Sequence, residues 1–447
     1  MKRVLLTTLG CKVNQYESAA FRTSFTEAGH TIARQGEEAD IVVINTCAVT
    51  AKAGAQSRNA IRQAVRNNPQ ARIMITGCYA EIAAEQLAGL EELAGREFSL
   101  IGNSKKDLLV PTAVDFDAQM QQMLLGAIDQ ASEICRLPVR RFGDRTRAYL
   151  RIQDGCESYC TYCIVPYTRG PSRSLPLAEV IAQAKTFAEG GYRELVLTGI
   201  HLGYYGRDLD EDMDITGLID RLSTETPLMR YRISSLEPME ITDRLLELMN
   251  SRDNIMPHFH IPLQSGDDEI LARMNRRYTT TQFRTVVEKV LEQVPEACIG
   301  IDILAGFPGE TEQQFTNTRD FLASIGCTYL HVFPYSRRPG TVAASYEDDV
   351  SKNVKDSRVA ELRKLGEQKK AAFHTRQVGR IVPVLVEGKR DGEGFLKGFS
   401  DNYVPVRFKG GDELKKQIAL VKLTEIDGAQ VRGEVVIDHE SGNYRHR

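Results

Sequence analysis

Strand-like and helical segments alternate along most of this chain, and that alternation restricts its fold more than any other feature. In the first hundred residues, three short apolar runs rich in β-branched residues are each followed by a helical stretch. The runs are 3–9, 40–46 and 72–76, and the helical stretches lie at 18–29, up to 65 and at about 81–93. This alternation predicts an α/β fold with a parallel, doubly wound sheet.

The same alternation resumes near residue 148. Helical segments such as 178–189 and 281–293 separate further apolar runs. The strands expected here are 149–153, 194–198, 230–234, 258–263, 299–304 and 330–334. Six β/α units in sequence predict a full or partial barrel, whose functional site lies at the carboxyl ends of its strands.

The remaining segments complete a division into domains. Residues 115–133 are rich in Gln, Met and Leu and predict a helix, whereas the basic run that follows is broken by Pro138 and Gly143 and has the composition of a linker. A charged helix is expected over 351–379, and short β runs with Gly and Asp turns then predict a small barrel. We expect an N-terminal domain at 1–113, a linker at 114–144, a barrel at 145–372 and a β-barrel at 373–440.

Bulk composition excludes two classes of protein. The net charge of -3 argues against a protein that binds polyanions over its whole surface, so any nucleic-acid contact would use a local basic patch. The N-terminal apolar run is short and becomes polar after Cys11, unlike a signal peptide. Because no stretch approaches roughly 18 apolar residues, we expect a cytoplasmic protein without membrane association.

Nine cysteines require an explanation in such a protein, because stable disulfides are rare in the cytosol. The strongest pattern is Cys156-x3-Cys160-x2-Cys163, just after an expected strand. Three thiolates at this spacing can hold one iron–sulfur cluster and leave one iron without a protein ligand, since clusters ordinarily take four cysteines. Zinc is the main alternative, but zinc sites more often use two Cys-x2-Cys pairs, so we favour the cluster.

A second trio of cysteines lies in the N-terminal region. Cys11, Cys47 and Cys78 each follow one of its three expected strands. In open α/β sheets ligands bind outside the carboxyl ends of the strands, so these thiols can converge on one point. Simple burial is the alternative, because a free cysteine packs like a small hydrophobic residue. Packing is the better interpretation for the other three cysteines, which have no partners at ligand spacing: Cys135, Cys298 and Cys327.

The spacing of Cys156, Cys160 and Cys163 resembles that of the radical S-adenosylmethionine superfamily. The resemblance implies that the open iron chelates S-adenosylmethionine, whose reductive cleavage yields a 5′-deoxyadenosyl radical. It places Tyr162 beside the adenine and Thr198–Gly199 beside the methionine ammonium. It also implies contacts to the ribose, the carboxylate and the adenine from a further set: Glu237, Gln264, Asp302, Gly306 and Pro308.

With that motif downstream, the N-terminal trio resembles the methylthiotransferases of the same superfamily. Their N-terminal domain holds a second cluster through three such cysteines, and GFSDNYVPV is typical of their terminal TRAM domain. The resemblance therefore implies two 4Fe-4S clusters as cofactors, with S-adenosylmethionine serving both as methyl donor and as radical source.

Three branches of that family differ in substrate: isopentenyladenosine in tRNA, threonylcarbamoyladenosine in tRNA, and an aspartate of a ribosomal protein. The branch that acts on threonylcarbamoyladenosine is the one most similar to TLGCKVNQYES, LTGIHLGYYG and HVFPYSRRPGT. The resemblance implies methylthiolation of C2 of N6-threonylcarbamoyladenosine, with a tRNA anticodon stem-loop as partner and an electron donor such as flavodoxin or ferredoxin. It does not identify the sulfur source.

Candidate RNA contacts come from basic and aromatic residues near the C-terminus and in the linker. Arg407 and Lys409 lie near Tyr403 and Phe408, a combination suited to phosphate contact and base stacking. The linker arginines fit either RNA binding or a solvated surface: Arg136, Arg140, Arg141, Arg145, Arg147 and Arg151.

Two other functions remain possible from the residues alone. The chain could be an RNA-binding iron–sulfur redox sensor, which would not cleave S-adenosylmethionine. It could also be a radical enzyme with a single cluster and an inert N-terminal domain, which would bind about four irons rather than about eight.

Overall fold

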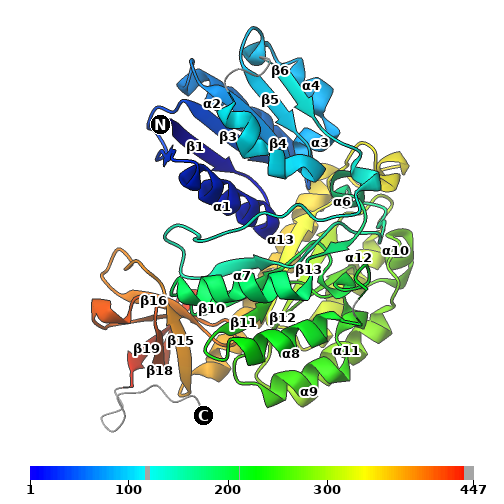
Figure 1. Ribbon diagram of the computed structural model, residues 1–447. Helices are drawn as coiled ribbons and strands as arrows, with labels where there is room; N and C mark the ends of the chain where they lie inside the picture. Colours follow the sequence, from blue (N-terminus) through cyan, green and yellow to red (C-terminus); the bar gives the residue numbers. More distant parts are fainter. Residues whose placement is uncertain (116–120, 211, 437–447) are drawn as a thin grey trace.

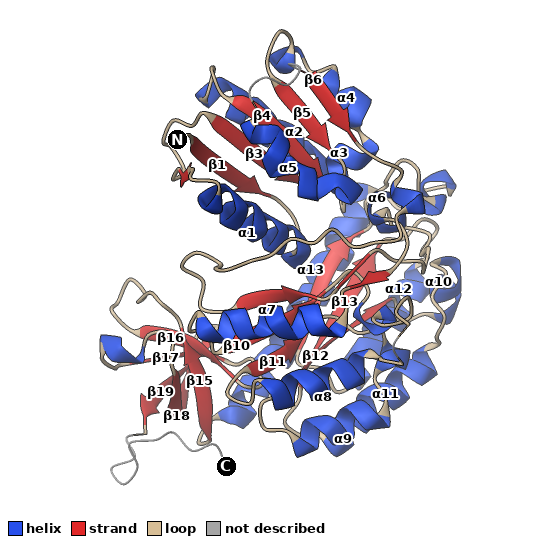
Figure 2. Ribbon diagram, viewed as in Figure 1, coloured by secondary structure: helices blue, strands red, loops and turns tan. Residues whose placement is uncertain are grey.

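A computed structural model describes residues 1–115, 121–210 and 212–436 of the 447-residue chain. An N-terminal α/β region packs on a larger central α/β region, and a small β-barrel lies to one side of the central region (Figures 1 and 2). Among these described residues, no helix is long and apolar enough to cross a membrane.

The N-terminal region is a parallel sheet, as predicted, with strand order β2-β1-β3-β4-β5-β6. Its central strands are buried along their whole length, which explains their Val- and Ile-rich sequences. The strands are β1 (Arg3–Thr8), β2 (Thr31–Ile32), β3 (Ile41–Thr46), β4 (Arg72–Gly77), β5 (Phe98–Ile101) and β6 (Gln121–Leu124). The helices are α1 (Lys12–Glu27), α2 (Ala51–Asn67), α3 (Cys78–Ile82), α4 (Ala84–Ala88) and α5 (Leu109–Val114).

Three predictions for this region were wrong. Helix α1 begins at Lys12, well before residue 18, and the helix expected at 81–93 is divided into α3, α4 and a 3₁₀ turn (Glu91–Leu93). The helix expected over 115–133 is replaced by β6 and a 3₁₀ turn (Ile128–Gln130), although residues 116–120 lie outside the described residues. Strand β6 pairs in parallel with β5, so backbone pairing at the sheet edge outweighs the helix propensity of Gln, Met and Leu.

The central region is a partial barrel of parallel strands, as predicted. Its strands form two sheets, β11-β10-β7 and β12-β13-β14, which isolated bridges Tyr231↔Ile255 and Ser235↔His260 connect. The strands are β7 (Ala148–Arg151), β10 (Glu194–Thr198), β11 (Arg230–Ile233), β12 (His258–Gln264), β13 (Cys298–Ala305) and β14 (Tyr329–Pro334). A short hairpin, β8 (Gln153–Asp154) with β9 (Arg173–Ser174), follows β7.

Helices cover the outside of the partial barrel (Figure 2). They are α7 (Leu177–Glu189), α8 (Ile215–Glu225), α9 (Asp243–Ser251), α10 (Asp268–Arg273), α11 (Thr280–Gln293) and α12 (Glu312–Ser324). The short helix α6 (Val165–Arg169) instead contacts α3 of the N-terminal region. Helix α13 (Lys352–Gln377) packs against β14 and leads into the last region.

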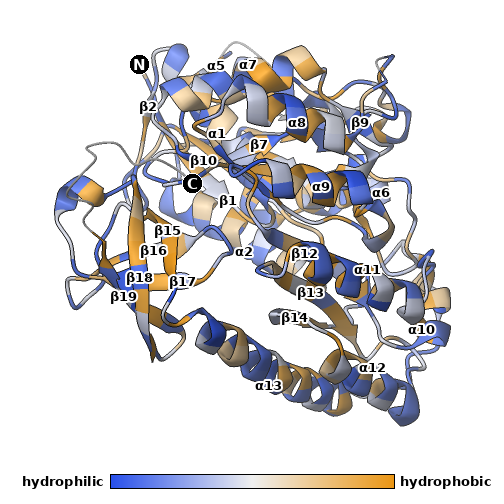
Figure 3. Ribbon diagram, turned by 90° about the horizontal axis from the view of Figure 1, so that it is seen from below, coloured by the Kyte–Doolittle hydropathy of each residue, from blue (hydrophilic) through white to orange (hydrophobic). Residues whose placement is uncertain are grey.

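The C-terminal region is a closed β-barrel with strand order β15-β16-β17-β19-β18, as predicted. The strands are β15 (Ile381–Val386), β16 (Leu396–Ser400), β17 (Pro405–Phe408), β18 (Ile418–Asp427) and β19 (Gln430–Val435). Figure 3 shows these strands as largely hydrophobic. Their inward-facing residues form a core of their own, which includes Val384, Val406 and Val421.

The basic segment between the first two regions has no regular secondary structure over 131–147 but is firmly packed. Leu137, Val139 and Phe142 are buried in a core that also contains Tyr16 and Phe187. Because this core includes residues from both α/β regions, the two sheets share one hydrophobic interface.

Candidate functional site

The structure brings Cys156, Cys160 and Cys163 together in the loop between β8 and α6. Cys160 and Cys156 lie close enough to Cys163 to act on its charge, and together with burial they raise the pKa of the Cys163 thiol to about 12. The Ser158 amide donates to Cys156 Sγ at 3.4 Å, and Arg276 Nη1 donates to Cys160 Sγ at 3.3 Å. The loop therefore presents three sulfur ligands with hydrogen-bond donors around them.

His201, which sequence reasoning missed, lies beside this loop. Its Nδ1 is 3.5 Å from Cys156 Sγ, and its Nε2 is 2.5 Å from Glu240 Oε1. Burial alone would lower the pKa of His201, but the hydrogen bonds to Cys156 and Glu240 raise it to about 10. An imidazolium at this position stabilises negative charge on the sulfur, and the pKa of Cys156 is correspondingly lowered. Its position two residues after Gly199, at a strand end, was the available sequence signal.

Three of the expected S-adenosylmethionine contacts lie close to the same loop. Thr198 and Gly199 end β10 next to Gln153, whose Oε1 accepts from the amides of Ile200 and His201 at 2.9 and 2.8 Å. Glu237 forms an ion pair with Arg276, the arginine that also donates to Cys160. These strand ends therefore surround Cys156 and Cys160.

Tyr162, Gly306 and Pro308 gather on a neighbouring wall. Tyr162 packs against the small apolar cluster that contains Phe307. Arg273 Nη2 donates to the Pro308 carbonyl at 2.7 Å, and the Arg273 carbonyl accepts from Thr161 Oγ1 at 2.9 Å. The Gly306–Pro308 turn is thus connected to the cysteine loop through Arg273.

Gln264 and Asp302 differ in where they lie. Gln264 is at a bulge that ends β12, with φ of 71°, next to Pro262, whose carbonyl accepts from Arg276 Nη2. Asp302 instead lies with His260 and His331: its Oδ1 is 2.8 Å from His260 Nε2 and 3.4 Å from His331 Nδ1. The structure therefore does not bring Asp302 together with the other expected contacts.

Cys11, Cys47 and Cys78 converge at the carboxyl ends of β1, β3 and β4. Burial raises the pKa of Cys47 to about 11, and both Cys78 and Cys11 contribute further. Gly10, with φ of 94°, makes room for this convergence, because a Cβ there would lie 2.8 Å from Cys47 Sγ. Cys47 and Cys78 are buried, whereas Cys11 is exposed.

A buried charged network, also missed from the sequence, lies between the two cysteine trios. Arg169 ends α6, six residues after Cys163, and its Nε donates to Cys78 Sγ at 3.3 Å. Its Nη1 is 2.6 Å from Glu17 Oε1 and 3.0 Å from Asp154 Oδ2. Burial alone would raise the pKa of Glu17, but Arg169, Lys106 and Arg151 lower it well below its usual range. The network therefore joins α1 and α3 of the N-terminal region to the segment that carries Cys156, Cys160 and Cys163.

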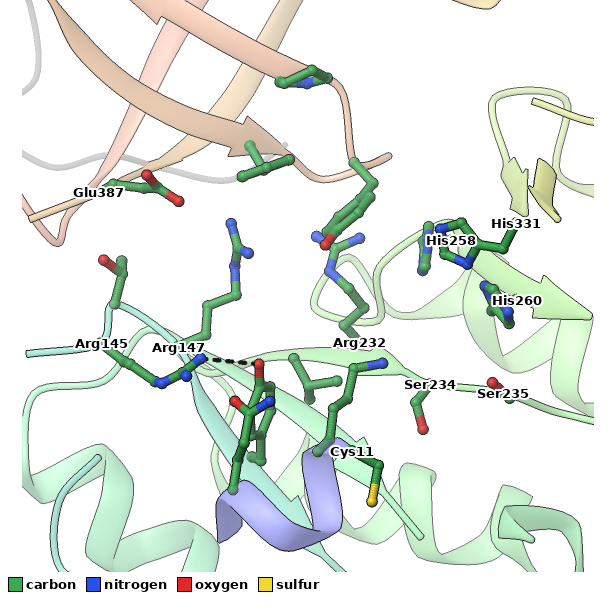
Figure 4. Close-up of a pocket in the computed structure, with 18 of the residues that line it drawn as sticks. Cys11, Arg145, Arg147, Arg232, Ser234, Ser235, His258, His260, His331 and Glu387 are labelled. Carbon is green, nitrogen blue, oxygen red and sulfur yellow. Dashed lines mark hydrogen bonds between the residues drawn. The ribbon is translucent and has the colours of Figure 1, made fainter. Parts of the chain in front are cut away.

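A cavity of about 1500 Å³ opens where the three regions meet. It is lined by Cys11 and Lys12 from the N-terminal region, by inward-facing residues of the partial barrel, and by Phe399 and Tyr403 of the β-barrel. Figure 4 shows the histidines of β12 and β14 on one side, Arg145 and Arg147 on the other, and Arg232 between them. The side of the cavity nearest the N-terminal sheet carries Cys11.

The predicted RNA-contact residues near the C-terminus were partly wrong. Phe408 is fully buried, so it cannot stack on a base. Arg407 is already paired with Asp391, Glu393 and Asp427. Of the arginines that the sequence assigned to the linker, Arg151 is a buried residue of β7, whereas Arg145 and Arg147 line the cavity.

Both trios fit iron–sulfur clusters in their donor chemistry. Each gathers three sulfur atoms, and the other cysteines of the described ranges lie elsewhere: Cys298 in the C-terminal core, and Cys135 and Cys327 against the central core. Three sulfur ligands leave one iron of a four-iron cluster open. The strand ends beside the first trio carry the carboxylate of Glu237 and would hold the amino-acid part of a ligand bound to such an iron.

Comparisons with known proteins agree with this geometry. The radical SAM superfamily matches residues 150–322, and the family described as Uncharacterized protein family UPF0004 matches residues 3–95. A radical S-adenosylmethionine methyltransferase, TsrM from Kitasatospora setae, has a similar fold at a TM-score of 0.56, with 14% identity and 77% of each chain covered. The fold and the cysteine loop thus define a radical S-adenosylmethionine enzyme.

Proteins of similar sequence identify the family within this superfamily. The Bacillus subtilis protein called threonylcarbamoyladenosine tRNA methylthiotransferase MtaB is 38% identical over 98% of this chain and 97% of its own. The Aquifex aeolicus protein of the same name is 33% identical over 94% of this chain and all of its own. The chain belongs to the radical S-adenosylmethionine methylthiotransferase family, whose members use S-adenosylmethionine and carry two 4Fe-4S clusters.

Proposed function

We propose that the protein is a tRNA methylthiotransferase that adds a methylthio group to C2 of N6-threonylcarbamoyladenosine beside the anticodon. The relatives that carry this substrate in their names match nearly the whole chain. A Thermoanaerobacter protein named tRNA-2-methylthio-N(6)-dimethylallyladenosine synthase is 32% identical over 96% of this chain and 92% of its own, so isopentenyladenosine is the competing substrate.

The observation that carries the proposal is the position of Cys11. Two cysteines of its trio are buried in the N-terminal region, whereas Cys11 lines the cavity shared by all three regions. Pockets for small molecules usually measure about 300–1,000 Å³, so a cavity of about 1500 Å³ has room for a nucleoside and the chain that carries it. A base turned out of its loop into this cavity would meet the N-terminal site.

The residues of the chain take distinct roles in this proposal. Cys156, Cys160 and Cys163 hold one 4Fe-4S cluster, which with S-adenosylmethionine supplies the 5′-deoxyadenosyl radical when both are bound. Thr198, Gly199 and Glu237 orient S-adenosylmethionine from the strand ends, and Tyr162, Gln264, Gly306 and Pro308 complete its pocket. Asp302 belongs instead to the wall of the cavity. Cys11, Cys47 and Cys78 hold the cluster from which sulfur is delivered.

The two sites would work on one substrate because a buried connection links them. The cysteine loop continues directly into α6, whose Arg169 contacts Cys78, Glu17 and Asp154. A rigid connection of this kind preserves the distance between the radical and the sulfur during turnover.

We also propose the domain division 1–113, 114–144, 145–372 and 373–440, a cytoplasmic location, and flavodoxin or ferredoxin as electron donor.

The test is mass spectrometry of tRNA nucleosides from cells that lack the protein. We expect the methylthio group to disappear from threonylcarbamoyladenosine and to persist on isopentenyladenosine. The reconstituted protein should restore it on an anticodon stem-loop RNA that carries threonylcarbamoyladenosine. Loss from isopentenyladenosine instead, or no loss at all, would reject the proposal. If the protein is instead an RNA-binding redox sensor, the reconstituted protein will form no 5′-deoxyadenosine from S-adenosylmethionine.

A further inference from the structure

The geometry of the adenine ring restricts which side chains can contact its N6 substituent. C2 and the carbon that bears N6 flank N1 on the same edge of the ring. If C2 meets the site at Cys11, the N6 substituent must lie against the cavity wall that borders Cys11. A threonylcarbamoyl group brings a carboxylate, a hydroxyl and a ureido group to that wall, whereas an isopentenyl group brings only hydrocarbon.

Lys12 is a cation on that wall. It follows Cys11 directly, begins α1 and lines the cavity. Burial lowers the pKa of its ammonium and Arg232 adds to this effect, whereas Asp302 and Cys11 oppose it. Within residues 1–115, 121–210 and 212–436, however, it forms no hydrogen bond or ion pair. Lys12 is therefore a charge beside Cys11 that no group in the described part of the chain neutralises directly.

The charged neighbours of Lys12 are already engaged with other partners. Asp302 pairs across β13 and β14 with His331 and accepts from His260 on β12, so its carboxylate has two imidazole partners. Arg232 is held by Glu194, with 3.0 Å between Nε and Oε1, and donates to the Asp401 carbonyl at 2.9 Å. Because these groups are tied to the protein, Lys12 remains available to an incoming anion.

The cavity carries further polar groups near Lys12. Besides Lys12 it carries the hydroxyl groups of Ser234 and Ser235 on the segment after β11, and the half-exposed ring of His331. The Nδ1 atom of His331 faces Asp302, and its other ring nitrogen has no hydrogen-bond partner among the described residues. An apolar substituent here would leave these groups without water or partners, which is costly in a binding site.

We propose that Lys12 binds the carboxylate of the threonylcarbamoyl group and thereby selects this substrate over isopentenyladenosine. The inference rests on the proposed function, because it identifies the group of the same substrate that the cavity wall binds. A charge-assisted hydrogen bond between the ammonium and the carboxylate supplies affinity. The unpaired ammonium that would remain beside an isopentenyl group supplies discrimination.

The experiment compares Lys12→Met and Lys12→Arg with the wild-type holoenzyme on three synthetic anticodon stem-loop RNAs. One carries threonylcarbamoyladenosine, the second its neutral carboxamide analogue, and the third isopentenyladenosine. Fluorescence anisotropy without S-adenosylmethionine gives each Kd, and mass spectrometry gives kcat/KM for methylthiolation. Lys185→Met, which removes a lysine on the outer face of α7 that pairs with Glu225, is the matched control.

We expect Lys12→Met to weaken binding of the carboxylate RNA about 10- to 100-fold, the range for a hydrogen bond to a charged group. Binding of the carboxamide RNA should change little, and Lys12→Arg should retain most of the preference for the carboxylate. Lys185→Met should bind all three RNAs as the wild type does.

The outcomes separate this inference from the proposed function. An equal loss on the carboxylate and carboxamide RNAs would mean that Lys12 supports the cysteine site rather than the carboxylate, and would overturn the inference. Unchanged binding by Lys12→Met would overturn it as well. Failure of the wild-type enzyme to methylthiolate the threonylcarbamoyl RNA would overturn the proposed function, while the Kd values would still show whether Lys12 reads the carboxylate.

Discussion

The two cysteine trios reach the same kind of geometry by different routes. Cys156, Cys160 and Cys163 lie within one loop, so their convergence is a local property of eight residues. Cys11, Cys47 and Cys78 come from three separate strand ends and converge only because β1, β3 and β4 are parallel neighbours. A loop can be recognised from its spacing, whereas the second site depends on correct folding of a whole sheet.

Their surroundings differ as well. Beside the loop, His201 donates to Cys156 and lowers the pKa of that thiol. In the N-terminal trio, burial raises the pKa of Cys47, although Arg169 partly offsets this effect. Neighbours of the loop within the central region thus stabilise negative charge on Cys156. In the N-terminal trio, the corresponding stabilisation depends on Arg169, which the central region supplies.

The largest expected effect separates the two sites by function. Cys160→Ala should abolish formation of 5′-deoxyadenosine and methylthiolation, because the radical source loses a ligand. Cys47→Ala should abolish methylthiolation yet still cleave S-adenosylmethionine. Iron analysis should give about four irons for each variant against about eight for the wild type. Cys327→Ala, at a packing position, is the control and should keep both clusters. Methylthiolation by Cys47→Ala would show that sulfur delivery does not use this site.

Arg169→Leu should damage both the fold and the N-terminal site. The variant leaves Glu17 and Asp154 buried without their main partner, and breaking a buried ion pair costs about 3–5 kcal/mol. Chemical denaturation of the apoprotein measures that loss, and iron analysis should show preferential loss of the N-terminal cluster. Arg221→Leu removes an exposed helix pair and should cost less than about 1 kcal/mol. Equal stability of the two variants would show that the buried network does not connect the regions.

His201→Gln should affect the loop alone. The substitution removes a cationic donor to Cys156, so we expect formation of 5′-deoxyadenosine to slow about 10- to 100-fold, as for other groups that support metal ligands. A redox titration should show a more negative potential for this cluster, because its reduced state loses electrostatic stabilisation. His30→Gln, in the N-terminal region, serves as control. An unchanged potential would show that His201 only packs.

The smallest expected effect is a loss of folding stability in acid, caused by protonation of Glu17. We expect no such loss at neutral pH. Because Arg169, Lys106 and Arg151 lower the folded-state pKa of Glu17 below its usual 4.5, the unfolded chain binds its proton first as the pH falls. Stability from this carboxylate is therefore complete above pH 4.5 and is lost progressively below it. Thermal unfolding of the apoprotein over this range should show the loss, and Glu17→Gln should flatten it relative to Glu38→Gln, an exposed control. Parallel pH profiles for the two variants would contradict this assignment.

Much of the architecture was accessible from the sequence. Alternating apolar runs predicted the parallel N-terminal sheet, the partial barrel and the terminal β-barrel, because strand and helix periodicities are local. Strand β6 was missed, since its sequence favours a helix and only pairing with β5 makes it a strand. The early start of α1 was missed as well, which concealed Lys12 as a residue at the edge of the cavity.

The sequence by itself determined the two groups of cysteines and the order of the elements that carry them. Spacing identified the loop at Cys156, and strand ends identified Cys11, Cys47 and Cys78. Only the tertiary structure decided that Arg169 contacts Cys78 and that Asp302 joins His260 and His331. It also decided that Lys12 lines the cavity without an ion-pair partner among the residues that the structure describes. These contacts join residues far apart in the chain, so they follow from how the sheets pack against one another rather than from any local pattern.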